Sequence, residues 1–109
     1  MTIVPPKVSV SPRELRRMFN EGRYAARAAQ GEFTTHVVVN GHPTSPRAPV
    51  PFCTRSQEIV LRDRTGREVV AWHQYLKPDG TLGASGQPDP KRLLKDGVLY
   101  VRWWEPRSG

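Results

Sequence analysis

The segment from Ser11 to Gln30 restricts the fold most, because its apolar and basic side chains separate onto opposite sides of a helix. At about 100° per residue, the apolar side comprises Leu15, Met18, Phe19, Gly22, Ala25, Ala26 and Ala29. The polar side comprises Arg13, Arg17, Asn20, Tyr24 and Arg27. Ser11 and Glu14 have the spacing of a capping box, and Pro12 suits a first helical turn. This pattern predicts one long N-terminal amphipathic helix that packs on a sheet through its apolar side.

Stretches rich in β-branched and aromatic residues predict strands at 32–39, 57–61, 67–76 and 98–104. Turn residues at 63–66 make the second and third of them a hairpin. Apolar groups lie on both sides of 67–76, which is typical of a central strand. Within the first stretch, the alternation of a strand predicts that one set of side chains faces the helix: Phe33, Thr35, Val37 and Val39.

The remaining segments complete the predicted architecture. Asp89 and Pro90 are suited to cap a short helix over residues 91–95, with Gly97 just after its end. The predicted fold class is therefore α+β, with the long helix packed on a mainly antiparallel sheet of about four strands and the short helix before the last strand. We expect residues 1–10 as an extended lead-in with an edge-strand segment, 11–106 as one domain and 107–109 as a tail.

Charge and cysteine content restrict the partners and the cellular location. The chain has 17 Lys and Arg against 10 Asp and Glu, a formal net charge of +7, which favours acidic partners and above all nucleic acid. Cys53 is the only cysteine, as expected for a reducing cytoplasm. Neither a signal peptide nor a run of roughly 20 apolar residues is found, so we expect a cytoplasmic protein without a membrane partner.

The arginine side of the helix gives the first functional hypothesis. Guanidinium groups on one helix face can bridge phosphates along a nucleic-acid backbone, and a tyrosine among them can stack on a base. The expected nucleic-acid-binding residues are Arg13, Arg17, Asn20, Tyr24, Arg27, Lys91 and Arg92. A solvated polar face gives the same pattern. We predict a small non-catalytic nucleic-acid-binding or regulatory protein, with RNA or single strands slightly preferred.

A small, toxin-like ribonuclease that needs no metal is the alternative hypothesis. Its candidate catalytic residues are His73, His36 and Tyr75. A histidine would move the 2′-hydroxyl proton of RNA while arginines neutralise the charge that develops on the phosphate. The candidate arginines are Arg55, Arg62 and Arg102. The expected layout resembles that of several small ribonucleases without sharing a motif with them, and a strand histidine held by a local hydrogen bond is the purely structural explanation.

A protein-interaction module that docks on an acidic partner is a further alternative. One exposed tryptophan would anchor the contact, and Trp104 is favoured over Trp103 and Trp72 for that position. An unpaired edge strand would also be compatible with a homodimer.

Metal and cofactor chemistry has little support in the sequence. His36, His42, His73 and Cys53 lack the spacing of paired metal ligands. The glycines at 80, 83 and 86 match neither a Walker pattern nor a dinucleotide fingerprint, and a flexible loop explains them. We therefore expect no metal and no cofactor.

Overall fold

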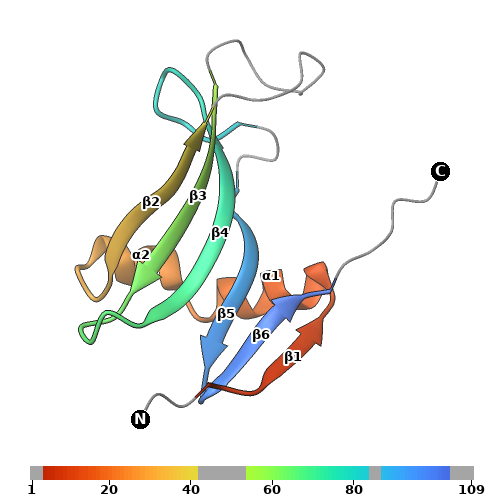
Figure 1. Ribbon diagram of the computed structural model, residues 1–109. Helices are drawn as coiled ribbons and strands as arrows, with labels where there is room; N and C mark the ends of the chain where they lie inside the picture. The colour runs from red at the N-terminus through yellow and green to blue at the C-terminus, as the bar shows by residue number, and fades with distance from the viewer. Residues whose placement is uncertain (1–3, 42–53, 84–86, 104–109) are drawn as a thin grey trace, which may run out of the picture.

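The computed structural model describes residues 4–41, 54–83 and 87–103, and its elements are drawn in Figure 1. The elements are β1 (Lys7–Val10), α1 (Pro12–Glu21), α2 (Tyr24–Ala29), β2 (Thr34–Gly41), β3 (Arg55–Arg62), β4 (Glu68–Leu76), β5 (Asp89–Lys95) and β6 (Val98–Arg102). The strands form one six-stranded sheet in the order β1-β6-β5-β4-β3-β2. β1 runs parallel to β6, and all other neighbours are antiparallel. The sheet is therefore mixed and larger than the antiparallel sheet of about four strands that we predicted.

The predicted long helix over Ser11–Gln30 is wrong, because the chain forms two short helices in its place. Ser11 caps α1 as expected, its hydroxyl accepting a hydrogen bond from the backbone N–H of Glu14 at 3.1 Å. Arg23 then adopts a left-handed conformation with φ of 54° between the two helices. This break changes the phase of the helical pattern. Tyr24, predicted on the polar side, is buried as a result, whereas the predicted apolar positions Ala25, Ala26 and Ala29 are exposed.

The predicted short helix over 91–95 is also wrong, because this segment is strand β5. Its residues pair with strands on both sides, and fully buried Leu93 lies between Val70 of β4 and Tyr100 of β6. Asp96 and Gly97 both have positive φ, 51° and 78°, and they form the two-residue connection from β5 to β6. Asp-Gly is the typical sequence of such a hairpin turn. Pairing in the sheet thus overrides the local capping pattern.

The hairpin and the central strand were predicted correctly. β3 and β4 are joined by a turn in which the carboxylate of Asp63 accepts hydrogen bonds from the backbone N–H groups of Thr65 and Arg67, at 2.9 and 3.1 Å. β4 has paired neighbours on both sides, as expected of a central strand. The expected edge segment within residues 1–10 is also present, as β1.

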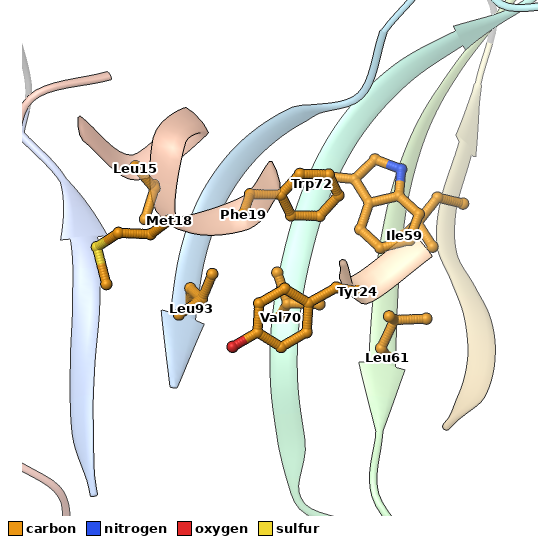
Figure 2. Packing of buried hydrophobic residues seen from close by; sticks show 9 residues of the cluster. All are labelled: Leu15, Met18, Phe19, Tyr24, Ile59, Leu61, Val70, Trp72 and Leu93. Carbon is orange, nitrogen blue, oxygen red and sulfur yellow. The ribbon is translucent and has the colours of Figure 1, made fainter. Parts of the chain in front are cut away.

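Both helices lie on the same side of the sheet (Figure 1). Figure 2 shows the buried side chains between them and the strands, which are Leu15, Met18, Phe19, Tyr24, Ile59, Leu61, Val70, Trp72 and Leu93. The opposite side of the sheet carries the alternate positions of the same strands. We call it the open face, since no described helix covers it. On β3 and β4 it carries three pairs of register partners, Ser56 with Tyr75, Glu58 with His73, and Val60 with Ala71.

β2 departs from the prediction in the direction of its side chains. Phe33, just before the strand, packs against the core, but Thr35, Val37 and Val39 are exposed instead of facing the helices. The register with β3 shifts between Val37 and Val39, so the simple alternation that we assumed does not hold along the strand.

Candidate functional site

Arg17, on the arginine side of α1, is paired with two neighbouring carboxylates. The guanidinium of Arg17 donates to the carboxylate of Glu14 and, at 2.9 Å, to both carboxylate oxygens of Glu21. These hydrogen bonds, the one to Glu14 first, raise the pKa of Arg17. Arg13 and Asn20 are exposed on the same helix. We call the predicted polar side of the helix the helix stripe; it comprises Arg13, Arg17, Asn20, Tyr24 and Arg27. At the centre of this stripe, the positive charge of Arg17 is thus already balanced.

The α2 end of the stripe is part of the packing. Arg27 makes a two-bond contact to the carboxylate of Glu32, with both donor–acceptor distances 2.8 Å. Its guanidinium carbon also lies 5.1 Å from the centre of the Tyr24 ring and 4.8 Å from that of Phe33. Tyr24 is 6% exposed and its ring is stacked on that of Phe19, with 6.1 Å between centroids. Tyr24 therefore has no free face on which a base could stack.

The two predicted phosphate contacts on β5 have ion-pair partners of their own. Arg92 pairs in the register with Ala71 on the open face, and it donates to Glu68 at 2.7 Å and to Glu58 at 3.4 Å. Lys91 donates instead to Asp89 at 2.8 Å. Arg92 thus lies on the other side of the sheet from the helices and does not share a surface with the predicted arginine side.

Asp89, the first residue of β5, is the centre of a different group of cations. Its carboxylate accepts hydrogen bonds from Lys91 Nζ at 2.8 Å and from Arg102 Nη1 at 3.0 Å, and Arg16 Nη2 lies 3.6 Å away. We call Asp89, Arg16, Lys91 and Arg102 the Asp89 cluster. Its cations come from α1, β5 and β6. Three cations face one carboxylate, which leaves two positive charges unbalanced within the cluster.

Burial and the surrounding cations act on Asp89 in opposite directions. Its partial burial raises its pKa, but the hydrogen bond from Lys91 and the charges of Lys91 and Arg102 outweigh this, so the pKa is lowered overall. Asp89 is therefore ionised at neutral pH and holds the cations in place. Arg16 is held further by Gln87, whose side-chain oxygen accepts a hydrogen bond at 3.3 Å.

His73 lies beside this cluster, since it is the register partner of Asp89 across β4 and β5. Its Nε2 is 2.7 Å from the hydroxyl oxygen of Ser56, and its ring meets the ring of Tyr75 edge-on, with 4.7 Å between centroids. Burial and then the charge of Lys91 lower the pKa of His73, while Asp89 and Glu58 oppose the shift. His73 is thus predominantly neutral at pH 7 and able to accept a proton.

The structure brings together two of the three predicted catalytic residues. His73 and Tyr75 are in ring contact on β4. His36 is on β2, where its Nε2 lies 2.9 Å from the hydroxyl oxygen of Thr34. It pairs in the register with Val60 of β3, so β3 separates it from the strand of His73.

The three arginines considered for charge neutralisation are also dispersed. Arg102 belongs to the Asp89 cluster. Arg62 donates to the backbone carbonyl of Gly66 at 3.2 Å, near the β3–β4 turn, and Arg55 is exposed at the start of β3. Among these three arginines, only Arg102 binds Asp89, the register partner of His73.

Sequence reasoning missed the two residues that organise the cluster, Arg16 and Asp89. Arg16 belongs to neither the predicted apolar side nor the predicted polar side of the helix, and Asp89 was predicted as a helix cap. Arg16 and Asp89 come close to each other because α1 packs over β5. No local spacing in the sequence indicates such a contact.

Several other predictions concern residues beyond those that the structure describes. Cys53, His42, Gly86, Trp104 and the tail at 107–109 lie outside the described residues. Of the remaining tryptophans, Trp72 is buried in the core and Trp103 is 47% exposed. Within the described ranges, no three His, Cys, Asp or Glu side chains are placed to hold a metal ion. Nor is any described helix both long and apolar enough to cross a membrane.

Comparison of the chain with protein-family models, with curated proteins and with solved structures finds no match. The geometry of the site and the charge of the chain therefore carry the functional argument.

Proposed function

We propose that the protein binds a phosphate-bearing polyanion, with RNA or another single-stranded nucleic acid preferred, at the Asp89 cluster. The observation that carries the proposal is the convergence of Arg16, Lys91 and Arg102 on one carboxylate. The two unbalanced positive charges of this cluster belong to a chain with a formal net charge of +7. Unbalanced cations of this kind supply most of the affinity of proteins for nucleic-acid backbones.

The same cluster is arranged in advance for a phosphate. Asp89 orients the donor groups of Lys91 and Arg102, so little side-chain freedom remains to be lost on binding. The cations are only partly buried and remain accessible to a ligand. The nearby rings of His73 and Tyr75 offer aromatic surface beside the cations, which suits unpaired bases.

Fluorescence anisotropy with labelled single-stranded RNA tests this proposal. The double substitution Lys91→Gln and Arg102→Gln should weaken binding and reduce the slope of log affinity against log salt by about 1 for each lost phosphate contact. Arg17→Gln is the control for each single substitution of the pair, because it removes the same one charge from an arginine already balanced by Glu14 and Glu21. It should change binding much less.

Two outcomes contradict the proposal. In the first, Arg17→Gln weakens RNA binding as strongly as the double substitution, which would place the binding site on the helix stripe. In the second, the parent protein does not bind RNA at about 150 mM salt. An acidic protein would then be the better candidate for the partner.

A ribonuclease activity is the second candidate, and the environment of His73 specifically favours it. A neutral His73 can accept the proton of a 2′-hydroxyl while the 2′-oxygen attacks phosphorus. The bond from phosphorus to the 5′-oxygen breaks, a 2′,3′-cyclic phosphate forms, and the leaving oxygen takes a proton from solvent. Cations of the Asp89 cluster would stabilise the additional negative charge on the phosphate.

Incubation with RNA followed by a gel separates the two candidates. His73→Ala should abolish cleavage without abolishing RNA binding, and His36→Ala, on a different strand, should leave cleavage intact. RNA that stays whole with the parent protein removes the ribonuclease candidate and leaves the binding proposal standing.

A further inference from the structure

The second edge of the sheet, strand β2, lacks the usual protection against pairing with another chain. β2 is the last strand in the sheet order, and within the described residues it pairs only with β3. Its outer edge therefore offers backbone N–H and C=O groups to a further strand. The strand has 8 residues, and Thr34 to Asn40 are all exposed.

The side chains of β2 are also unusual for a free edge. The sequence TTHVVVNG contains no Lys, Arg, Asp, Glu or Pro, although 25% of the chain is charged. Val37, Val38 and Val39 are 51%, 47% and 50% exposed. Charged residues and prolines are what normally keep edge strands apart. The register shift between Val37 and Val39 perturbs the strand but adds neither.

The opposite edge of the sheet differs in these respects. β1 begins with Lys7, directly after Pro5 and Pro6. A proline has no N–H to donate, and a lysine on an edge disfavours the approach of another strand in a basic protein. The two edges are therefore unlike, and only β2 is suited to accept a strand.

We propose that β2 pairs in antiparallel orientation with β2 of a second copy of this chain, which joins two sheets across a two-fold axis. The distribution of charge restricts where two copies can meet. Each chain is strongly basic, so contacts between two copies are repulsive over most of the surface, but the uncharged β2 brings no like charges together. An acidic peptide would find no cation on this strand, and a β2-to-β1 contact would meet Lys7 and the prolines.

The two-fold arrangement also limits assembly to a dimer. In an isologous contact both copies use the same surface, so the contact closes on itself. The valines at 37–39 would then lie near the axis and cover one another, which removes apolar surface from water. This inference does not depend on polyanion binding, because no member of the Asp89 cluster lies on β2.

Site-directed disulfide crosslinking tests the proposal directly. In a Cys53→Ser background, Val37→Cys, Val38→Cys and Val39→Cys are made separately and oxidised mildly. The variant whose cysteine lies at the two-fold axis should give a covalent dimer on a non-reducing gel, because a residue at that axis lies opposite its own copy in the neighbouring strand, close enough for a disulfide. Val8→Cys is the matched control, since Val8 is 43% exposed on the other edge strand. It should not crosslink.

Sedimentation of the unmodified chain gives an independent readout. The parent protein should become dimeric as its concentration is raised to about 100 µM, and Val38→Lys should remain monomeric while its circular dichroism spectrum is unchanged. A monomeric parent protein over this range overturns the proposal. Equal crosslinking at position 8 and at 37–39 overturns it as well. If Val38→Lys does not fold, the cysteine series still decides the question.

Discussion

Asp89 on β5 and His73 on β4 lie opposite each other in the sheet, and the carboxylate of one acts on the imidazole of the other. Lys91, which binds Asp89, acts on His73 with the opposite sign. The Asp89 cluster and His73 are therefore one electrostatic unit, and a charge change in the cluster is measurable at the histidine.

The titration of His73 is the first prediction. Its burial, followed by the charge of Lys91, should hold its pKa below the usual 6.5. Lys91→Gln removes a cation and should raise this pKa, whereas Asp89→Asn removes an anion and should lower it. NMR titration of the imidazole protons, assigned with His73→Asn, measures both shifts. A pKa at or above 6.5 in the parent protein would contradict the described environment.

The same shift has a consequence for stability. Because the folded-state pKa is below the unfolded value of 6.5, the unfolded chain takes up the proton first. His73 should therefore destabilise the fold as the pH falls below 6.5. His73→Asn should reduce the loss of unfolding free energy in that range.

Acid sensitivity at a lower pH is predicted for the ion pair between Glu68 and Arg92. The hydrogen bond from Arg92 lowers the pKa of Glu68 against the opposing effect of burial. The pair therefore stabilises the fold fully above pH 4.5, and this contribution is lost as the pH falls through the lower folded-state pKa.

Glu68→Gln tests this pair by urea unfolding at pH 7 and pH 3. The substitution should cost about 1–2 kcal/mol at pH 7, between the values of exposed and buried pairs. It should cost less at pH 3, because the stabilising contribution of the ion pair decreases as the pH falls below 4.5. Glu21→Gln, on the exposed surface of α1, is the control and should have a small effect at both pH values. An equal loss at both pH values for Glu68→Gln would mean that packing, and not charge, is involved.

The junction of the two helices gives a prediction about packing. A Cβ on Gly22 would lie 2.2 Å from Cε2 of the Tyr24 ring, so Gly22→Ala must displace a buried aromatic side chain. Overpacking of this kind costs typically about 1–3 kcal/mol. Chemical denaturation should show this loss for Gly22→Ala and almost none for Gly41→Ala, where no atom lies within 4 Å of the new Cβ. Equal stability of the two variants would contradict the packing of Tyr24 on Gly22.

Local patterns in the sequence predicted some elements and failed at definable points. The cap at Ser11, the β3–β4 turn at Asp63 and the central position of β4 depend on neighbouring residues and were predicted correctly. The break at Arg23 was not, because an uninterrupted helix has nearly the same local pattern. The break places Tyr24 between Phe19 and Phe33, and this packing involves residues that only the folded chain brings together.

One failure could have been avoided. The Asp96-Gly97 pair is a strong hairpin signal, and together with the apolar residues at 93–94 and 98–101 it predicts the β5–β6 hairpin. The interpretation of Gly97 as a helix end overlooked this. The Asp89 cluster could not have been found in the same way, since Arg16, Asp89 and Arg102 are distant in sequence and meet only through the packing of α1 and the pairing of β5 with β6.

The affinity of the Asp89→Asn variant for labelled single-stranded RNA tests the central claim most directly. This substitution removes the negative charge but keeps a side-chain oxygen, and Lys91 and Arg102 both donate to a single oxygen of Asp89. The cations therefore stay oriented, and binding should become about tenfold tighter at low salt and more dependent on salt. Asp63→Asn makes the same change in net charge at the β3–β4 turn, and it should have a much smaller effect. A folded Asp89→Asn variant that binds RNA no more tightly than Asp63→Asn would contradict polyanion binding at the Asp89 cluster.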